Sequence, residues 1–198
     1  DLEFKDYSDD VALLLNRIGE YSSKREKCIE IVKNLVCENK SVIIWCIFKQ
    51  SMDDLLKGLL SMGIAAEIVN GSVPQDERTS ILNSFKSRKI KVLITNPHTL
   101  AESVSLHTVC HDAIYFEYSF NLVHLLQSKD RIHRLGLPNN QYTQYWYLEN
   151  YYDIEGETYS LDQNIYQRLL DKEQIMLDAI SQQSIESVTT TEEDLELV

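Results

Sequence analysis

The segment 127–136 (QSKDRIHRLG) carries two arginines, Arg131 and Arg134, three positions apart. On a helix, which turns about 100° per residue, both arginines lie on one face together with Gln127 and Asp130. The opposite face carries three apolar residues, Leu122, Leu125 and Ile132. Guanidinium groups suit phosphate oxygens because their N–H donors form a planar fork. The spacing is typical of a phosphate-binding edge and equally of a solvent-exposed charged face, and periodicity alone does not choose between them.

Apolar runs alternate along the chain with segments of helical periodicity. The expected strands are 42–48, 64–69, 91–95, 113–116 and, as a half-exposed edge strand, 143–148. The expected helices are 24–38, 51–62, 75–87, 121–135 and 166–180. The run 42–48 is apolar throughout, which is typical of a central strand in a parallel sheet covered on both faces. The sequence therefore predicts an α/β layer fold.

Polar and small residues follow the expected strands, at the edge where open α/β sheets bind ligands. These loops contain Lys49 and Ser51 after the first strand, and Thr95 and His98 after the third. Ordinary turns use the same residue types, so turn chemistry explains each loop taken alone equally well.

The net charge of −12 is concentrated at one end of the chain. Residues 149–198 contain 13 acidic and 2 basic residues, whereas residues 1–148 contain 18 acidic and 17 basic residues, a net charge of −1. A nearly neutral body lacks the basic footprint of a free-standing DNA-binding domain. Residues 182–198 contain little apolar material to bury, so we expect a disordered acidic tail there.

No apolar run approaches the roughly 20 residues needed to span a bilayer, and the chain does not begin with a signal-peptide pattern. The four cysteines form no C-x-x-C pair, which favours reduced thiols over a metal site. We therefore expect a soluble, cytoplasmic protein without a membrane partner or a bound metal of its own. The first residue, Asp1, suggests that the chain is excised from a longer protein.

Residues 127–136 resemble motif VI of superfamily 2 nucleic-acid motors in its Swi/Snf form, Q-x-x-D-R-x-H-R-x-G-Q. Every fixed position matches except the final glutamine, where Leu137 stands. Further segments resemble the same family in the same order: SSK (22–24), VIIWCIF (42–48), VNGSVPQDERTSILNSF (69–85) and FEYSFN (116–121). In the last of these, Glu117 and Phe120 replace the family's Asp and Trp. The resemblance covers residues 22–180, and the short, insertion-free form is closer to bacterial members than to eukaryotic remodellers.

The resemblance implies the C-terminal RecA-like domain of a Swi/Snf-type DNA translocase, with a mainly parallel sheet between two layers of helices. It divides the chain into a linker (1–21), the RecA-like domain (22–150), a helical extension (151–181) and the acidic tail (182–198). The resemblance implies that a preceding RecA-like ATPase domain holds ATP and Mg²⁺. It implies that Arg131 and Arg134 act on this ATP as arginine fingers, and that Gln127, Asp130 and Glu102 lie beside the nucleotide. The resemblance also implies contacts with the phosphates of double-stranded DNA that do not read its sequence. The residues implied for these contacts are Lys49, Ser51, Thr95 and His98.

The segment 95–107 departs from the family's glycine-rich motif V. Leu100, Ala101 and Ser103 stand where glycines or small residues are expected, which restricts the backbone of the loop that would couple DNA contact to hydrolysis. The chain also lacks a G-x-x-x-x-G-K-[ST] loop, a G-x-G-x-x-G loop and a D-E-x-[HD] box after a strand. We therefore expect that this chain alone does not hydrolyse ATP.

Two other readings stay open. One is the C-terminal domain of a DEAD-box RNA helicase, although the D-R-x-H-R spacing fits that family's H-R-x-G-R-x-x-R motif less well. The other is a RecA-like interaction module without ATPase activity, which the altered motif V favours and the intact Gln127, Arg131 and Arg134 disfavour.

Overall fold

The computed structural model describes residues 22–101, 105–133, 141–154 and 156–182. Its centre is a five-stranded sheet in the order β2-β3-β1-β4-β5, and every pairing within it is parallel. The strands are β1 (Val42–Trp45), β2 (Ala66–Val69), β3 (Val92–Thr95), β4 (Asp112–Tyr115) and β5 (Gln144–Tyr147). All residues of β1, β3 and β4 are buried, as expected of parallel strands covered on both faces.

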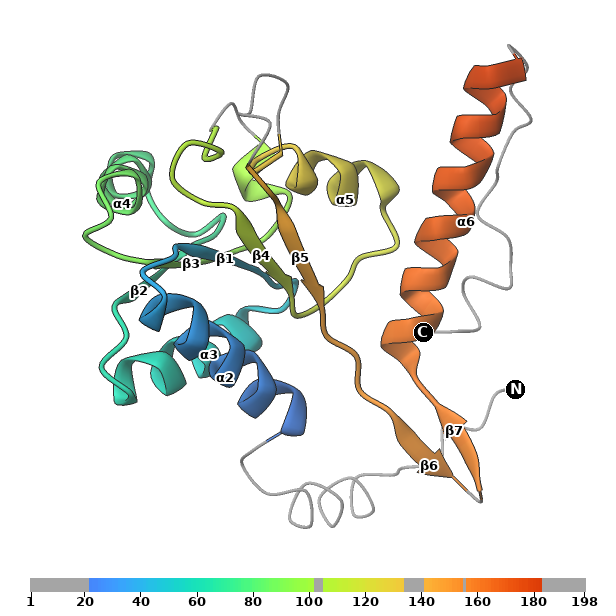
Figure 1. The fold of residues 1–198 in the computed structure, drawn as a ribbon, viewed down its shortest axis with the longest axis horizontal. Coiled ribbons are helices and arrows are strands. Elements are labelled where there is room, and N and C mark those ends of the chain that lie inside the picture. Colours follow the sequence, from blue (N-terminus) through green and yellow to red (C-terminus); the bar gives the residue numbers. More distant parts are fainter. Residues whose placement is uncertain (1–21, 102–104, 134–140, 155, 183–198) are drawn as a thin grey trace, which may run out of the picture.

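Helices cover both faces of this sheet (Figure 1). On one face, α2 (Ser23–Cys37) and α3 (Lys49–Ser61) contribute to a core cluster with Val42 and Ile44 of β1. On the other, α4 (Gln75–Lys86) and α5 (Leu122–Lys129) contribute to a second cluster with Ile43 and Trp45 of the same strand. Alternate residues of one strand therefore enter separate cores, and the predicted three-layer α/β fold is confirmed.

Two short strands that the sequence did not predict follow β5. They are β6 (Tyr152–Ile154) and β7 (Glu157–Tyr159), which pair antiparallel, and Gly156 lies between them with φ of 87°. Their side chains between Tyr151 and Tyr159 that the structure describes are exposed, so no buried face imposes the alternation by which strands are recognised in a sequence. A single-turn 3₁₀ helix, η1 (Thr99–Ala101), was not predicted either.

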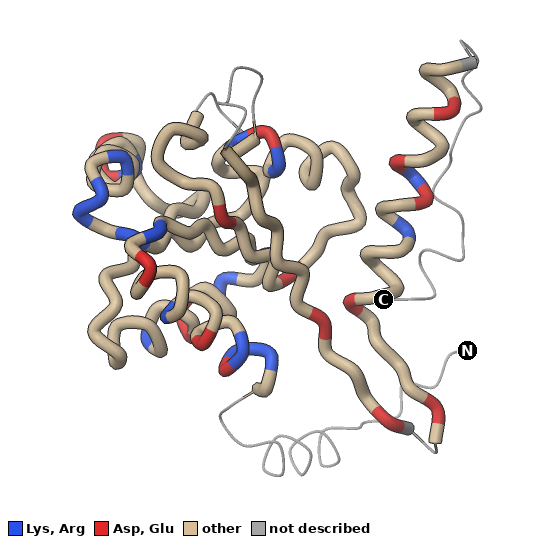
Figure 2. The backbone as a smooth tube through the Cα atoms, in the orientation of Figure 1, with Lys and Arg blue, Asp and Glu red and all other residues tan. Residues whose placement is uncertain are grey.

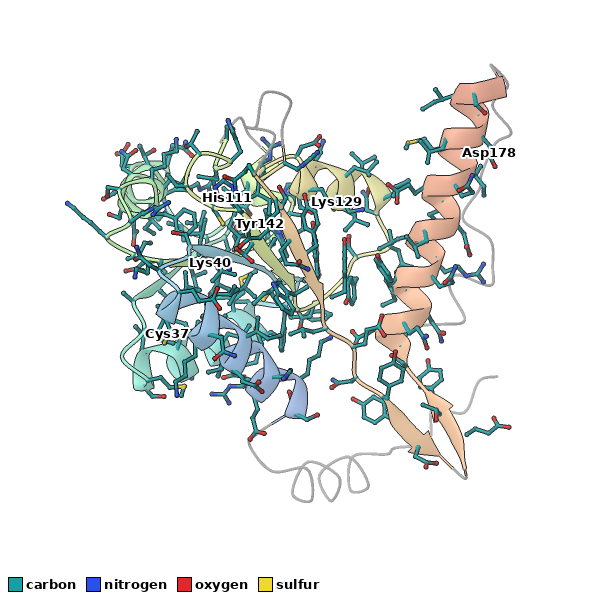
Figure 3. All side chains as sticks on the ribbon, in the orientation of Figure 1. Cys37, Lys40, His111, Lys129, Tyr142 and Asp178 are labelled. Atoms are coloured by element: carbon teal, nitrogen blue, oxygen red, sulfur yellow. The ribbon has the colours of Figure 1, made fainter. Side chains whose placement is uncertain are left out.

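The long helix α6 (Leu161–Gln182) packs against the sheet beside β5 through a cluster of tyrosines. The ring centroids of Tyr147 and Tyr166 lie 4.6 Å apart, and those of Tyr115 and Tyr147 lie 4.9 Å apart. Leu169 of α6 is 1% exposed within the same core. Lys129 of α5, labelled in Figure 3, reaches towards α6, where its Nζ lies 3.9 Å from Glu173. The C-terminal helix is therefore built into the core of the domain.

Charge is distributed unevenly over these elements (Figure 2). Basic residues gather at the end of α4 and before β3, at Lys86, Arg88, Lys89 and Lys91. Acidic residues are frequent along the hairpin and α6, where Asp153, Glu157, Asp162, Asp171 and Glu173 lie. The tail 183–198 lies outside the described residues. None of the helices that the structure describes is both long and apolar enough to cross a bilayer.

We predict that Leu169→Ala lowers the free energy of unfolding by about 2–5 kcal/mol, because it leaves a cavity between α6 and the sheet. The matched control is Leu177→Ala on the same helix, where the side chain is 51% exposed, and that change should stay within about 0.5 kcal/mol of wild type. Urea unfolding followed by circular dichroism measures both. Equal stability of the two variants would contradict the packing of α6 on the domain core.

Candidate functional site

The loop from β1 into α3 is held by the carboxylate of a residue that follows the neighbouring strand β4. Oε2 of Glu117, which follows β4, accepts the backbone N–H of Ile47 at 2.8 Å and that of Phe48 at 2.9 Å. Its Oε1 accepts the hydroxyl of Ser51, in the first turn of α3, at 2.5 Å. A negative charge at this place also complements the positive end of the α3 dipole. Glu117 therefore fixes both the shape of the loop and the start of the helix.

The side of this loop that faces the core is buried. Cys46 is fully buried directly after β1, and burial raises the pKa of its thiol well above the usual value, with the Glu117 carboxylate adding to the rise. The outward side is open, since Phe48 is 66% exposed and Lys49 is also exposed. The loop therefore presents an aromatic ring and an ammonium group to solvent from a backbone that is anchored from below.

The four predicted phosphate-contact residues are placed differently. Lys49 and His98 are exposed at the carboxyl edge, after β1 and β3 respectively. Ser51 is half-buried and donates to Glu117, so its hydroxyl is engaged within the domain. Thr95 is 0% exposed and its hydroxyl donates to the Asn96 carbonyl at 3.4 Å, so its side chain is not presented to solvent in this chain, and its predicted contact with phosphates stays a prediction.

The segment after β3 forms the altered motif V. Asn96 caps it, since Oδ1 of Asn96 accepts the Thr99 N–H at 2.7 Å. Leu100, one of the residues standing in place of glycine, is 1% exposed and belongs to the same core cluster as Leu82 of α4. A cavity of about 150 Å³ lies between this turn and α4. The bulkier residue at position 100 therefore packs in the core.

The loop after β2 is also tied down by its own side chains. Asn70 Oδ1 accepts the N–H of Ser72 at 2.9 Å and its hydroxyl at 2.7 Å. Arg78 of α4 donates through Nη2 to the carbonyls of Val73 at 3.2 Å and Asn70 at 3.4 Å. These contacts join the loop to the helix that follows it. The loops after β1, β2 and β3 are therefore shaped by side-chain to backbone hydrogen bonds.

The predicted arginine-bearing helix is shorter than expected. α5 ends at Lys129, so Asp130 is its C-cap and Arg131 lies in the turn that follows. The N–H groups of Arg131 and Ile132 donate to the carbonyls of Ser128 and Lys129, at 3.3 and 3.2 Å, and tighten this turn. Leu106 donates its N–H to the Arg131 carbonyl at 2.9 Å, while Ile132 is 0% exposed. Burying Ile132 and pairing with Leu106 ends the helix, which periodicity could not reveal.

The predicted opposition of polar and apolar faces holds only in part. Leu125 and Ile132 are buried and Asp130 is exposed, but Arg131 and Gln127 are partly buried. Arg134 and Glu102 lie outside the described residues, so their predicted roles stay predictions. Among the described residues, no group of three or more His, Cys, Asp or Glu side chains is arranged to hold a metal ion.

The candidate residues fall into two groups. Lys49, Ser51 and His98 lie at the carboxyl edge of the sheet. α5 begins after β4 and returns to the start of β5, so Arg131 lies towards the amino ends of the strands, where His111 accepts the N–H of Gln144 at 2.8 Å. Among the candidate residues that the structure describes, those at the carboxyl edge and Arg131 are not gathered into one pocket. The structure separates an edge suited to contact with a chain of phosphates from a turn that carries an arginine.

Sequence reasoning missed the role of Glu117. Glu117 was noted as a residue that follows a predicted strand and as a replacement for Asp in the segment 116–121, but no role was assigned to it, since its partners lie 66 to 70 positions away in the sequence. The available signal was its place directly after a buried strand, at the ligand-binding edge.

We predict that Glu117→Ala lowers the free energy of unfolding by about 1–3 kcal/mol, because it leaves the partly buried N–H of Ile47 and the hydroxyl of the half-buried Ser51 without their acceptor. Hydrogen exchange at the amides of Ile47 and Phe48 should accelerate more than exchange in β3. Glu117→Gln, which keeps a carbonyl oxygen acceptor, should lose less. Exchange at Ile47 and Phe48 that stays at the wild-type rate in Glu117→Ala would rule out the anchoring role.

Comparison with known proteins shows which proteins this chain resembles in sequence. The Drosophila melanogaster protein named ATP-dependent RNA helicase p62 is 28% identical over 117 residues, which are 58% of this chain and 15% of that protein. The Bacillus subtilis protein named putative ATP-dependent helicase/translocase YwqA is 26% identical over 117 residues, 58% of this chain and 12% of that protein. The chain thus spans less than a fifth of the length of these two relatives.

Solved structures share the fold. The C-terminal part of the Fun30 ATPase domain superposes with a TM-score of 0.61 and 20% identity, covering 81% of this chain and 51% of that one. An S. cerevisiae Dbp5 variant bound to RNA and ADP BeF3 gives a TM-score of 0.59 and 18% identity, covering 75% of this chain and 35% of that one. At these identities the likeness concerns the fold.

β5 and α6 follow residue 136, whereas strands β1–β4, helices α2–α5 and the anchored loops at the carboxyl edge lie within residues 23–136. These residues match the family Helicase_C, described as the Helicase conserved C-terminal domain, over more than half of the chain. The chain therefore belongs to the family of helicase C-terminal domains, with a RecA-like fold.

Proposed function

We propose that this chain is the second motor domain of an ATP-dependent translocase on double-stranded DNA. In this proposal Arg131 and Arg134 are the arginine fingers, and ATP with Mg²⁺ is held by a preceding RecA-like domain of the same protein. The observation that carries the proposal is the fixed turn after α5, where Leu106 holds the Arg131 carbonyl at 2.9 Å and Ile132 is fully buried. A catalytic arginine needs such a prearranged backbone, because it stabilises the transition state only when its guanidinium group is already in position.

The chemistry proposed for the turn is charge compensation. Phosphoryl transfer spreads negative charge over the γ-phosphate oxygens, and an arginine brought in from a neighbouring domain is worth about 10³ to 10⁵ in rate. The other parts that this reaction needs, a phosphate-gripping loop and Mg²⁺ ligands, have no motif in the sequence. In this proposal ATP turnover is a property of the longer protein, in which this chain forms one side of the nucleotide site between the two motor domains.

Nucleic acid is proposed to bind along the carboxyl edge. Lys49 and His98 are exposed there, and Glu117 holds the backbone beneath Lys49 through Ile47 and Phe48. Residues 1–148 carry a net charge of −1, so we expect weak binding by the isolated chain and stronger binding when both motor domains contribute. Contacts of this kind position a duplex without reading bases.

RNA is the second candidate substrate. It is favoured by the names of several relatives, among them the D. melanogaster p62 and the mouse and human DDX17 proteins, all named RNA helicases. The D-R-x-H-R spacing of residues 130–134 supports duplex DNA instead, as does the name helicase/translocase of the B. subtilis relative.

We predict that Arg131→Ala or Arg134→Ala in the full-length protein lowers ATP turnover by roughly 10³, a barrier increase of about 4 kcal/mol, for whichever residue is the principal finger. Lysine should restore activity only in part, because it replaces a planar fork of donors with a point charge. The measurement is nucleic-acid-stimulated phosphate release.

Thermal melts accompany these assays because Arg131 is partly buried and its replacement can also affect stability. Assays run well below each melting temperature separate the two effects. Near-normal turnover in both alanine variants would reject the finger assignment and leave an interaction module without ATPase activity as the function.

We predict that double-stranded DNA stimulates the ATPase of the full-length protein more than single- or double-stranded RNA of equal length. Lys49→Ala should make the dependence of log affinity on log salt shallower by about 0.9, the value of one lost phosphate contact on a DNA duplex. The matched control is Lys57→Ala, further along α3, whose side chain is 74% exposed. Greater stimulation by RNA would transfer the proposal to the RNA helicase reading. Equal salt dependence in both lysine variants would remove Lys49 from the nucleic-acid contact.

A further inference from the structure

A buried ion pair joins the first helix of the described chain to the last. Nζ of Lys24, in the first turn of α2, lies 2.7 Å from Oδ1 of Asp162, at the start of α6. The two side chains are only 5% and 18% exposed. The other ion pair of α2, Lys27 with Glu30, has a similar length of 2.8 Å but exposures of 56% and 57%. Lys24 and Asp162 are therefore sheltered from solvent in a way that their neighbours are not.

The pair lies where three parts of the chain meet. Oδ2 of Asp162 accepts the N–H of Asn150, in the segment that leaves β5, at 2.8 Å. Lys24 Nζ lies 5.3 Å from the ring centroid of Phe116 and 5.7 Å from that of Tyr118. Tyr118 in turn donates its hydroxyl to the Leu148 carbonyl at 2.9 Å. One ammonium group thus contacts α6 and both neighbours of Glu117 in the sequence.

Glu117 connects this cluster to the proposed nucleic-acid edge. Phe116 and Tyr118, the residues on either side of Glu117, are both buried, so the backbone that carries its carboxylate is packed in the core. That carboxylate holds the N–H groups of Ile47 and Phe48. A continuous series of contacts therefore runs from α6 through Lys24 to the loop that carries Lys49.

A sheltered ion pair is a poor source of net stability, because taking both charges out of water offsets most of their attraction. Its attested use is to enforce one arrangement where apolar packing would allow several. Aromatic packing already attaches α6 at Leu169 and Tyr166, so the ion pair is not needed merely to hold the helix. It specifies where α6 begins relative to the residues around Glu117.

We propose that Lys24 and Asp162 are positioning residues that set the loop 46–51 for nucleic-acid contact according to the placement of α6. The role in nucleic-acid contact rests on the proposed function, whereas the effect on the loop does not. In this arrangement α6 and the β6–β7 hairpin form a control element: whatever displaces the start of α6 removes the partner of Lys24 and loosens the backbone beneath Lys49. Allosteric coupling of this kind typically amounts to about 5- to 150-fold.

The test compares four variants of the full-length protein: Lys24→Met, Asp162→Asn, the double variant, and the control Lys27→Met, which removes the exposed pair on the same helix. Hydrogen exchange is measured at the amides of Ile47 and Phe48, with the amides of β3 as a reference for global opening. Thermal melts and the ratio of nucleic-acid-stimulated to basal ATPase activity are measured in parallel.

We predict that both single variants accelerate exchange at Ile47 and Phe48 relative to β3 by at least about fivefold and lower the stimulation ratio by a similar factor. The double variant should regain melting temperature, because no unpaired charge stays buried, while its loop exchange stays fast. Lys27→Met should match wild type in every measurement.

Loop exchange that is unchanged in the single variants, or that recovers in the double variant together with the melting temperature, would overturn the proposal and leave the pair a purely structural contact. Failure of nucleic acid to stimulate the wild-type ATPase would instead contradict the proposed function. In that case the exchange measurements still decide whether the pair positions the loop.

Discussion

The loop between β1 and α3 contains two backbone N–H groups, those of Ile47 and Phe48, that both donate to one carboxylate about 70 positions later in the chain. The hydrogen bond from Ile47 is partly buried, and leaving such a donor without an acceptor costs more than the bond itself contributes, so this interaction constrains the surrounding structure. Glu117 can accept these two N–H groups only if β4 lies beside β1 in the observed register, with Trp45 opposite Tyr115. The start of α3, the exposure of Lys49 and the environment of Cys46 then follow from that register.

The sheet could be predicted because its information is local and repetitive. Continuous apolar runs such as 42–48 are compatible with few structures other than a strand buried on both faces, and every expected strand and helix appears. Most ends agree within a few residues, but α5 ends at Lys129 and not at the predicted residue 135. The half-exposed pattern of β5 identified an edge strand for the same reason. α6 was also expected, although it begins earlier than predicted because Ser160 accepts the Gln163 N–H at 3.1 Å.

The details of the site could not be predicted in the same way, because they depend on contacts between distant residues. Nothing near Lys129 in the sequence ends α5; the turn forms because Leu106 supplies a donor and Ile132 enters the core. Thr95 was selected because it ends a strand, but whether a strand's last side chain is exposed depends on what packs around it, and Thr95 is 0% exposed. Glu117 is an ordinary polar loop residue until β1 and β4 are adjacent. Motif resemblance found the segments, whereas the partners of each side chain required the fold.

The strand order also has a consequence for how this domain forms as it is synthesised. β1 pairs with β3 and β4, whose first residues lie 50 and 70 positions after Val42, and β2 pairs only with β3. A nascent chain that has reached the end of α3 therefore holds a fully apolar strand with no hydrogen-bonding neighbour. The emergence of β3 gives both earlier strands a partner at once, since it inserts between them in the order β2-β3-β1. Because such long-range pairing is slow and exposes apolar strands in the meantime, the interval before Val92–Thr95 leaves the ribosome is when this chain is most vulnerable to aggregation.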